Sequence, residues 1–130
     1  MKTFLQTFLL VVLLGGLYLF AFYKTPQQQL FEKTLASASA GDNQAAYQVA
    51  QFYARGQGTE PNGTQAAEWY RKAAADGNMQ AAWELAELYI KGQLVPADLE
   101  EASVYLQAAA RGGDVPAQKE LARFYQQGLG

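Results

Sequence analysis

The sequence predicts an all-α protein, in which an N-terminal transmembrane helix is followed by a short α-solenoid of about six antiparallel helices. Two observations predict this class: an apolar run near the N-terminus that is long enough to cross a bilayer, and a 36-residue repeat in the rest of the chain. The composition then narrows the function. The 130 residues include no cysteine and no histidine, which excludes disulfide frameworks, thiolate chemistry and the commonest general base and metal ligand.

The first element is an apolar segment that follows Lys2. It extends from Phe4 to Tyr23, and Gln6 and Thr7 are its polar residues near one end. A helix rises about 1.5 Å per residue, so this segment matches the hydrocarbon thickness of roughly 30 Å. We therefore expect residues 1–25 to form a signal anchor that contacts the lipid bilayer through residues 4–23.

The sequence leaves open whether this segment is retained. A cleavable signal has an apolar core of about 7–15 residues and then a small-x-small site. The core here ends in residues 19–23, Leu-Phe-Ala-Phe-Tyr, without such a pair, which favours a retained anchor. We expect a single-pass inner (cell) membrane protein with its C-terminal solenoid on the outer or periplasmic side. The alternative is a secreted or periplasmic protein after signal cleavage.

The rest of the chain repeats every 36 residues. Residues 41–76 align with 77–112 without a gap and with 11 identities, and the same offset continues to the end of the chain. Such a period indicates a repeat architecture. We expect one solenoid over 26–130, made of a half repeat 26–40, repeats 41–76 and 77–112, and a partial repeat 113–130.

Capping signals divide each repeat into two helices. Short side-chain acceptors stand where helices are expected to begin, and glycines stand where the first helix of each repeat ends. The expected N-caps are Thr25, Asp42, Asn62, Asn78, Asp98 and Asp114, and the expected terminating glycines are Gly56, Gly92 and Gly128. Pro26 suits the first position of a helix, so the half repeat predicts one more helix of the second kind.

Each helix pair has an apolar face that it cannot bury alone. Ala46, Val49, Ala50 and Tyr53 follow helical spacing on one side of the first helix. The second repeat places the same kind of residues 36 positions later. Neighbouring pairs must therefore stack and cover these faces.

Residues 67–74, Ala-Glu-Trp-Tyr-Arg-Lys-Ala-Ala, and 56–58, Gly-Gln-Gly, resemble the Sel-one-like repeat family, a relative of tetratricopeptide repeats. The resemblance covers about residues 27–130. It departs at Leu94, where the second loop glycine is missing, and after Gly128, where no second helix follows. The family implies right-handed stacks of α-hairpins whose inner surface holds partner proteins, in adaptors and scaffolds that often serve bacterial envelope processes. The β-lactam chemistry linked to its cysteine-rich members is not implied for a chain without cysteine.

Polar side chains opposite the packed faces are candidates for partner binding, although such a row is also typical of a solvated helix surface. Two aromatic residues lie beside this row, and the last helix carries apolar residues with no following helix to cover them. A solenoid end of this kind either exposes little apolar surface or is completed by a partner. The candidate residues are Gln44, Tyr47, Gln48, Gln51, Arg55, Trp83, Glu84, Glu87, Leu121, Phe124 and Tyr125.

The predicted function is that of a membrane-anchored adaptor or scaffold that binds envelope or membrane proteins. We expect no enzyme activity, no cofactor and no metal site. Residues 27–130 carry 8 basic and 12 acidic residues, so nucleic acid is not an expected partner. One alternative is a small accessory subunit that stabilises a larger membrane complex. A less favoured one is a glycan- or peptidoglycan-binding module that uses Tyr47 and Trp83.

Overall fold

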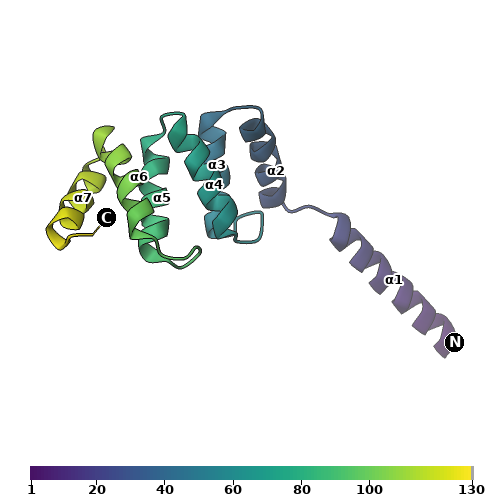
Figure 1. Ribbon diagram of the computed structural model, residues 1–130. Helices are drawn as coiled ribbons and strands as arrows, with labels where there is room; N and C mark the ends of the chain where they lie inside the picture. Colours follow the sequence, from purple (N-terminus) through teal and green to yellow (C-terminus); the bar gives the residue numbers. More distant parts are fainter. Residues whose placement is uncertain (130) are drawn as a thin grey trace.

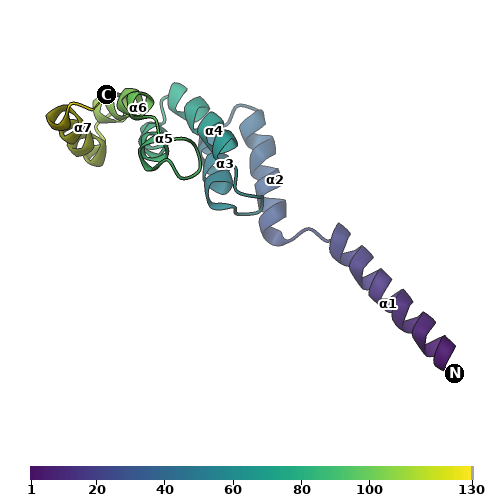
Figure 2. The same ribbon diagram turned by 60° about the horizontal axis from the view of Figure 1, so that its bottom comes forward.

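The structure, a computed structural model, describes residues 1–129 apart from the side chain of Ala21. Those residues form seven α-helices and no strand. The helices are α1 (Lys2–Phe22), α2 (Pro26–Ser39), α3 (Asn43–Arg55), α4 (Gly63–Ala75), α5 (Met79–Lys91), α6 (Leu99–Arg111) and α7 (Val115–Gln127). Figures 1 and 2 show α2 to α7 stacked in one row, with α1 projecting away beyond α2. The prediction of an all-α fold with an N-terminal apolar helix and a solenoid is confirmed.

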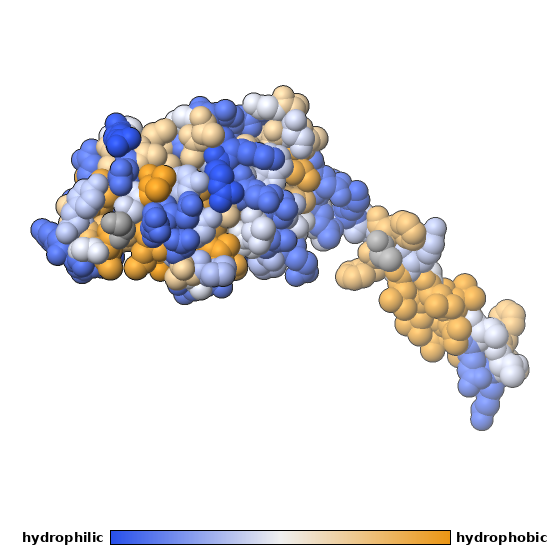
Figure 3. Space-filling view, in the orientation of Figure 1, coloured by the Kyte–Doolittle hydropathy of each residue, from blue (hydrophilic) through white to orange (hydrophobic). Residues whose placement is uncertain are grey.

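Helix α1 leaves its apolar side chains exposed. Lys2–Phe20 forms a 19-residue stretch with a mean hydropathy of 2.0, and none of it is buried. Figure 3 shows hydrophobic surface along the middle of this helix, whereas its N-terminal end is polar and the solenoid surface is mixed. By length and composition, one N-terminal apolar helix of this kind is compatible with a membrane span or a signal sequence.

The helices begin and end where local chemistry dictates. All six expected N-cap side chains accept a hydrogen bond from the backbone N–H three residues later. At Thr25 the Gln28 side chain also accepts from the backbone N–H of Thr25, which completes a capping box. Gly56, Gly92 and Gly128 end α3, α5 and α7 in the left-handed conformation that favours glycine. These predictions are confirmed.

Small and large apolar residues form the core between successive helices. Each helix of the solenoid packs against the helices that precede and follow it in the sequence. Val49, Leu85, Leu106 and Phe124 are the largest fully buried side chains, and buried alanines let the helices approach closely around them. The predicted face of α3 is buried at Ala46, Val49 and Ala50. The repeats therefore stabilise one another, as their uncovered faces predict.

Two equivalent loops cross the N-terminal ends of α2 and α4 at very short distances. In the first repeat, a Cβ added to Gly58 in the loop after α3 would lie 2.3 Å from the Gln27 backbone oxygen. In the second repeat, the loop after α5 carries Leu94 in the same place, and the glycine is on the helix instead. A Cβ on Gly63 would lie 2.1 Å from the Leu94 backbone oxygen. Both repeats thus have this close contact between loop and helix. The glycine that permits it is Gly58 in the loop of the first repeat and Gly63 on the helix in the second.

Candidate partner-binding cleft

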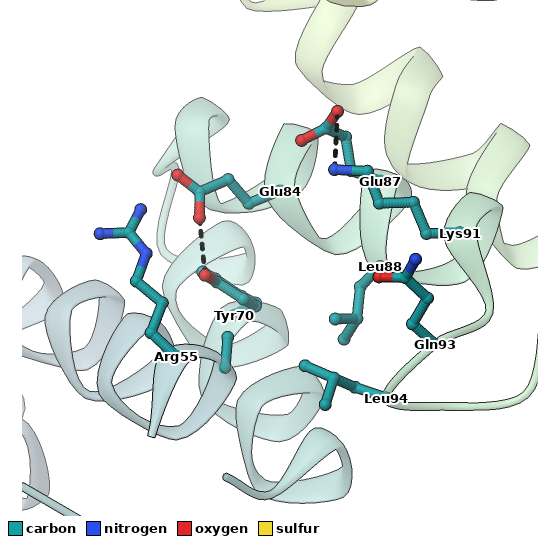
Figure 4. Close-up of a pocket in the computed structure, with 9 residues that line it drawn as sticks. Arg55, Tyr70, Glu84, Glu87, Leu88, Lys91, Gln93 and Leu94 are labelled. Atoms are coloured by element: carbon teal, nitrogen blue, oxygen red, sulfur yellow. Dashed lines mark hydrogen bonds and ion pairs between the residues drawn. The ribbon is translucent and has the colours of Figure 1, made fainter. Parts of the chain in front are cut away.

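The polar row predicted on the solenoid surface borders a cleft between two repeats. Three candidate residues, Arg55, Glu84 and Glu87, line a hollow of about 310 Å³. Its walls come from α3, α4, α5 and the loop that follows α5 (Figure 4). The lining residues are Ala54, Arg55, Tyr70, Glu84, Glu87, Leu88, Lys91, Gln93 and Leu94.

A hydrogen-bond network around Glu84 borders this cleft. The Tyr70 hydroxyl donates to Glu84 Oε2 at 2.6 Å, and the Tyr47 hydroxyl donates to Glu84 Oε1 at 2.6 Å. Gln51 Nε2 donates to the Tyr47 oxygen at 2.9 Å and to Glu84 Oε1 at 3.2 Å. One carboxylate on α5 therefore joins α3 and α4 of the preceding repeat.

The environment keeps both tyrosines protonated. Burial, followed by the hydrogen bond to Glu84, raises the pKa of Tyr70 well above its usual range. The same two causes raise the pKa of Tyr47. Because burial and a neighbouring carboxylate both disfavour a tyrosinate, the two hydroxyls act as donors rather than as acids.

Basic side chains are more accessible than the acidic ones at the cleft. Arg55 is exposed and makes no hydrogen bond or ion pair with any residue that the structure describes. Lys91 Nζ lies 3.4 Å from Glu87 Oε1, an exposed helix-surface pair that contributes little stability. Glu84 and Glu87 are both half-buried. A molecule that enters the cleft from solvent therefore meets the cations first.

The remaining α3 and α5 candidates are divided between exposed and packed positions. Gln44 and Gln48 are exposed on α3, whereas Gln51 is half-buried in the Glu84 network. Tyr47 is half-buried, with its ring centroid 6.1 Å from that of Tyr70. Trp83 is half-buried and packs against the second core cluster, formed by α5, α6 and α7. A binding role for any of these residues stays a prediction.

The three apolar candidates of α7, Leu121, Phe124 and Tyr125, were all expected on an uncovered face, and the structure buries one of them. Phe124 is 0% exposed and belongs to the core cluster that contains Ala82 and Leu106. That part of the prediction is wrong, because the Phe124 side chain points into the preceding unit. Leu121 is half-buried, and Tyr125 is 61% exposed. Only these two remain candidates for contact with a partner.

The cleft also contains residues that sequence reasoning did not select. In the sequence, Tyr70 stands out only as part of the family motif, and Leu88 was not selected. Leu94 offered the clearest signal, because an apolar residue occupies the loop position that is Gly58 in the first repeat. Among the described residues, no group of three acidic side chains could hold a metal ion.

A row of stacked antiparallel α-hairpins with a 36-residue period defines a solenoid repeat protein. The Sel1 repeat family model matches residues 43–78, 80–114 and 115–130. The chain therefore belongs to the Sel1 repeat family, and the resemblance stated above is confirmed. Sel1 repeat proteins are protein-interaction scaffolds, and their fold is typically non-enzymatic.

Solved structures with the same architecture support this assignment. A Sel1 repeat protein from Oxalobacter formigenes matches with 27% identity and a TM-score of 0.65, over 78% of this chain and 41% of that one. The protective antigen c5321 of uropathogenic Escherichia coli matches with 31% identity and a TM-score of 0.70, over 76% of this chain and 21% of that one. This chain thus spans less than half the length of either protein.

Helicobacter pylori cysteine rich protein B (hcpB) is similar over 92% of this chain and 93% of its own length. Its TM-score is 0.67 and its identity is 21%, so this likeness concerns the fold alone. No curated protein matches the sequence.

Proposed function

We propose that this protein is a membrane-anchored adaptor or scaffold that recruits a protein partner in a bacterial envelope process. In this proposal residues 1–25 are the anchor in the inner membrane. Residues 26–130 are the solenoid on its outer or periplasmic side, with the half repeat, two repeats and partial repeat expected from the sequence. The observation that carries the proposal is the cleft between the first two repeats, which places apolar side chains beside accessible charges.

Several exposed polar groups lie on α3, the helix that contributes Arg55 to the cleft. Gln44 and Gln48 lie along α3, which also carries Arg55 at its C-terminal end. Leu94 is 41% exposed at the opposite wall. Interfaces combine an apolar centre with a polar rim, and this surface has both components. Sel1 repeats elsewhere act as interaction scaffolds, so the same role is the simplest one for this surface.

The exposed face of α1 supports the membrane anchor. Phe8, Leu13 and Leu17 are examples of large apolar residues that stay more than half exposed in the structure. Leaving such a surface in water costs roughly 25 cal/mol for each Å², and a bilayer removes that cost. The chain becomes polar directly after α1, where Lys24 forms an ion pair of 2.7 Å with Glu32.

Photo-crosslinking in native membranes tests the adaptor proposal. A benzoylphenylalanine is placed at Lys91 in the cleft, and in a control at Glu100, which is exposed on α6 and does not line the cleft. We expect a protein adduct, identified by mass spectrometry, from position 91 and not from position 100. Adducts of equal yield at both positions, or none at position 91, would contradict the proposal.

The accessory-subunit alternative has one observation in its favour. Tyr125 and Val115 are more than half exposed on α7, and Leu121 is half-buried there. In this alternative a larger membrane complex covers that surface permanently. Removal of residues 1–24 separates the two functions: an adaptor still binds its partner as a soluble fragment, whereas a subunit that depends on its membrane span fails to assemble. The glycan-binding alternative has less support, because Tyr47 and Trp83 are both packed against neighbouring residues.

A further inference from the structure

We propose that the cleft accepts a protein segment in which a carboxylate lies next to a large apolar side chain. The carboxylate binds Arg55, and the apolar side chain packs against the wall that Leu88 and Leu94 form. This inference names the chemistry of the partner and rests on the proposed function of the same surface.

The carboxylates of the cleft are already engaged, which disfavours a basic partner. Both oxygens of Glu84 accept hydrogen bonds, one from Tyr70 and the other from Tyr47 and Gln51. These three hydrogen bonds occupy most of the acceptor capacity of the carboxylate, so little of it remains for a cation from a partner. Glu87 faces Lys91 in the same helix, so its charge is also matched within the cleft.

Arg55 is the cation of the cleft that has no direct partner, although its charge acts on the hydroxyls of Tyr47 and Tyr70 beside Glu84. Its guanidinium is exposed at the end of α3, and none of the described residues forms a hydrogen bond or ion pair with it. A guanidinium binds a carboxylate through two parallel hydrogen bonds, which gives direction as well as strength. The cleft can therefore select an acidic group although residues 27–130 carry more acidic than basic residues.

The apolar part of the cleft is held in place before a partner arrives. Figure 4 shows the Leu88 and Leu94 side chains on the wall that faces Tyr70 and Arg55. The Leu94 loop is fixed by its close approach to Gly63, which leaves no room for a side chain on the helix. A preformed wall lowers the ordering cost of binding. A volume of about 310 Å³ suits one large side chain rather than a whole helix.

Peptide selection on the full chain in lipid nanodiscs tests this inference. A displayed library of random 12-residue peptides is selected against the chain after counter-selection on empty nanodiscs. We expect enrichment of Asp or Glu next to Leu, Ile or Phe. The selected peptides are then measured by fluorescence anisotropy against the wild type and variants. Arg55→Gln should weaken binding about tenfold, because a charge-assisted hydrogen-bond pair is lost.

Two further variants complete the design. Leu94→Ser should weaken binding of the same peptides by removing the apolar wall, while Lys119→Gln, at an exposed position of α7 outside the cleft, should leave it unchanged. Enrichment of basic peptides, no enrichment, or equal binding to Arg55→Gln would overturn the inference. If position 91 still crosslinks a protein in these cases, the adaptor proposal stands; if it crosslinks none, the adaptor proposal fails independently.

Discussion

Replacement of Gly63 by alanine tests how the loop beside the cleft is held. Gly63 is the first residue of α4 and is buried, and its φ lies outside the left-handed region. On helix propensity alone alanine would be favoured by up to about 1 kcal/mol. However, the new Cβ would lie 2.1 Å from the Leu94 backbone oxygen and 2.5 Å from its carbonyl carbon. Backbone atoms cannot rotate away from such a contact, so the loop must shift.

Overpacking of this kind costs typically 1–3 kcal/mol. We therefore expect Gly63→Ala to destabilise the solenoid by about 2 kcal/mol, which lowers the melting temperature by roughly 8–16 °C for a domain of this size. The assay is thermal unfolding followed by circular dichroism at 222 nm, with the chain in nanodiscs. Thr64→Ala, at the neighbouring exposed position, is the matched control and should show no loss.

A double variant makes the test sharper. Gly63→Gln combined with Leu94→Gly transfers the arrangement of the first repeat, where Gln27 faces Gly58, to the second repeat. Gly58 has a φ of +72°, a conformation that glycine adopts easily, so a glycine at position 94 lets the loop adjust. The double variant should be more stable than Gly63→Gln alone. A Gly63→Ala protein as stable as the wild type would refute the reasoning.

Three more predictions concern the Glu84 network and the core. Tyr70→Phe should lower the free energy of unfolding in urea by about 1.5–3 kcal/mol, because a buried hydrogen bond to a charged group is lost. A decrease below about 0.5 kcal/mol, which is the effect of a surface substitution, would speak against this prediction. Folding raises the pKa of Tyr47 and of Tyr70 above the value of about 10 that a tyrosine has in the unfolded chain. The protonated hydroxyls therefore contribute their full stabilisation below about pH 10, and this contribution is lost as the pH rises through the pKa values of the folded state. Urea midpoints should therefore fall between about pH 10 and 12, and less so in the double phenylalanine variant. Leu85→Ala should cost about 2–5 kcal/mol, whereas Leu30→Ala, at a position that is 53% exposed, should change stability by about 0.5 kcal/mol or less.

Local chemistry made the helices predictable. The N-cap of each helix satisfies a donor within its own first turn, so Asp42 and Asn78 indicate a helix start without knowledge of the tertiary fold. The 36-residue period then places equivalent faces in register, and this fixes which side of α3 and α5 is buried. Val49 and Leu85, identified in this way, are fully buried.

The candidate site was less predictable because it depends on side chains from several helices. Glu84 and Gln51 share a polar row with exposed residues, and only the relative placement of α3, α4 and α5 shows that they bond to each other. Similarly, the sequence predicted an uncovered Phe124, whereas its side chain is fully buried in the core cluster that α7 shares with α5 and α6. Leu94 broke the loop pattern, and the compensating Gly63 lies far from it in sequence.

The two repeat junctions have the same helices but different chemistry. The residues equivalent to Tyr47, Tyr70 and Glu84 in the next junction are Trp83, Leu106 and Glu120. Leu106 is fully buried there and Trp83 packs on the same core, while Glu120 bonds to Arg123 within α7. In this second junction an apolar side chain, Leu106, stands where Tyr70 bonds to Glu84 in the first, so the carboxylate of Glu120 is not needed to join the helices. The first junction instead places Glu84 beside the cleft with both oxygens hydrogen-bonded, and we propose that Arg55 defines what the cleft selects. The function of a repeat protein of this kind is therefore to be sought where its repeats diverge, not where they agree.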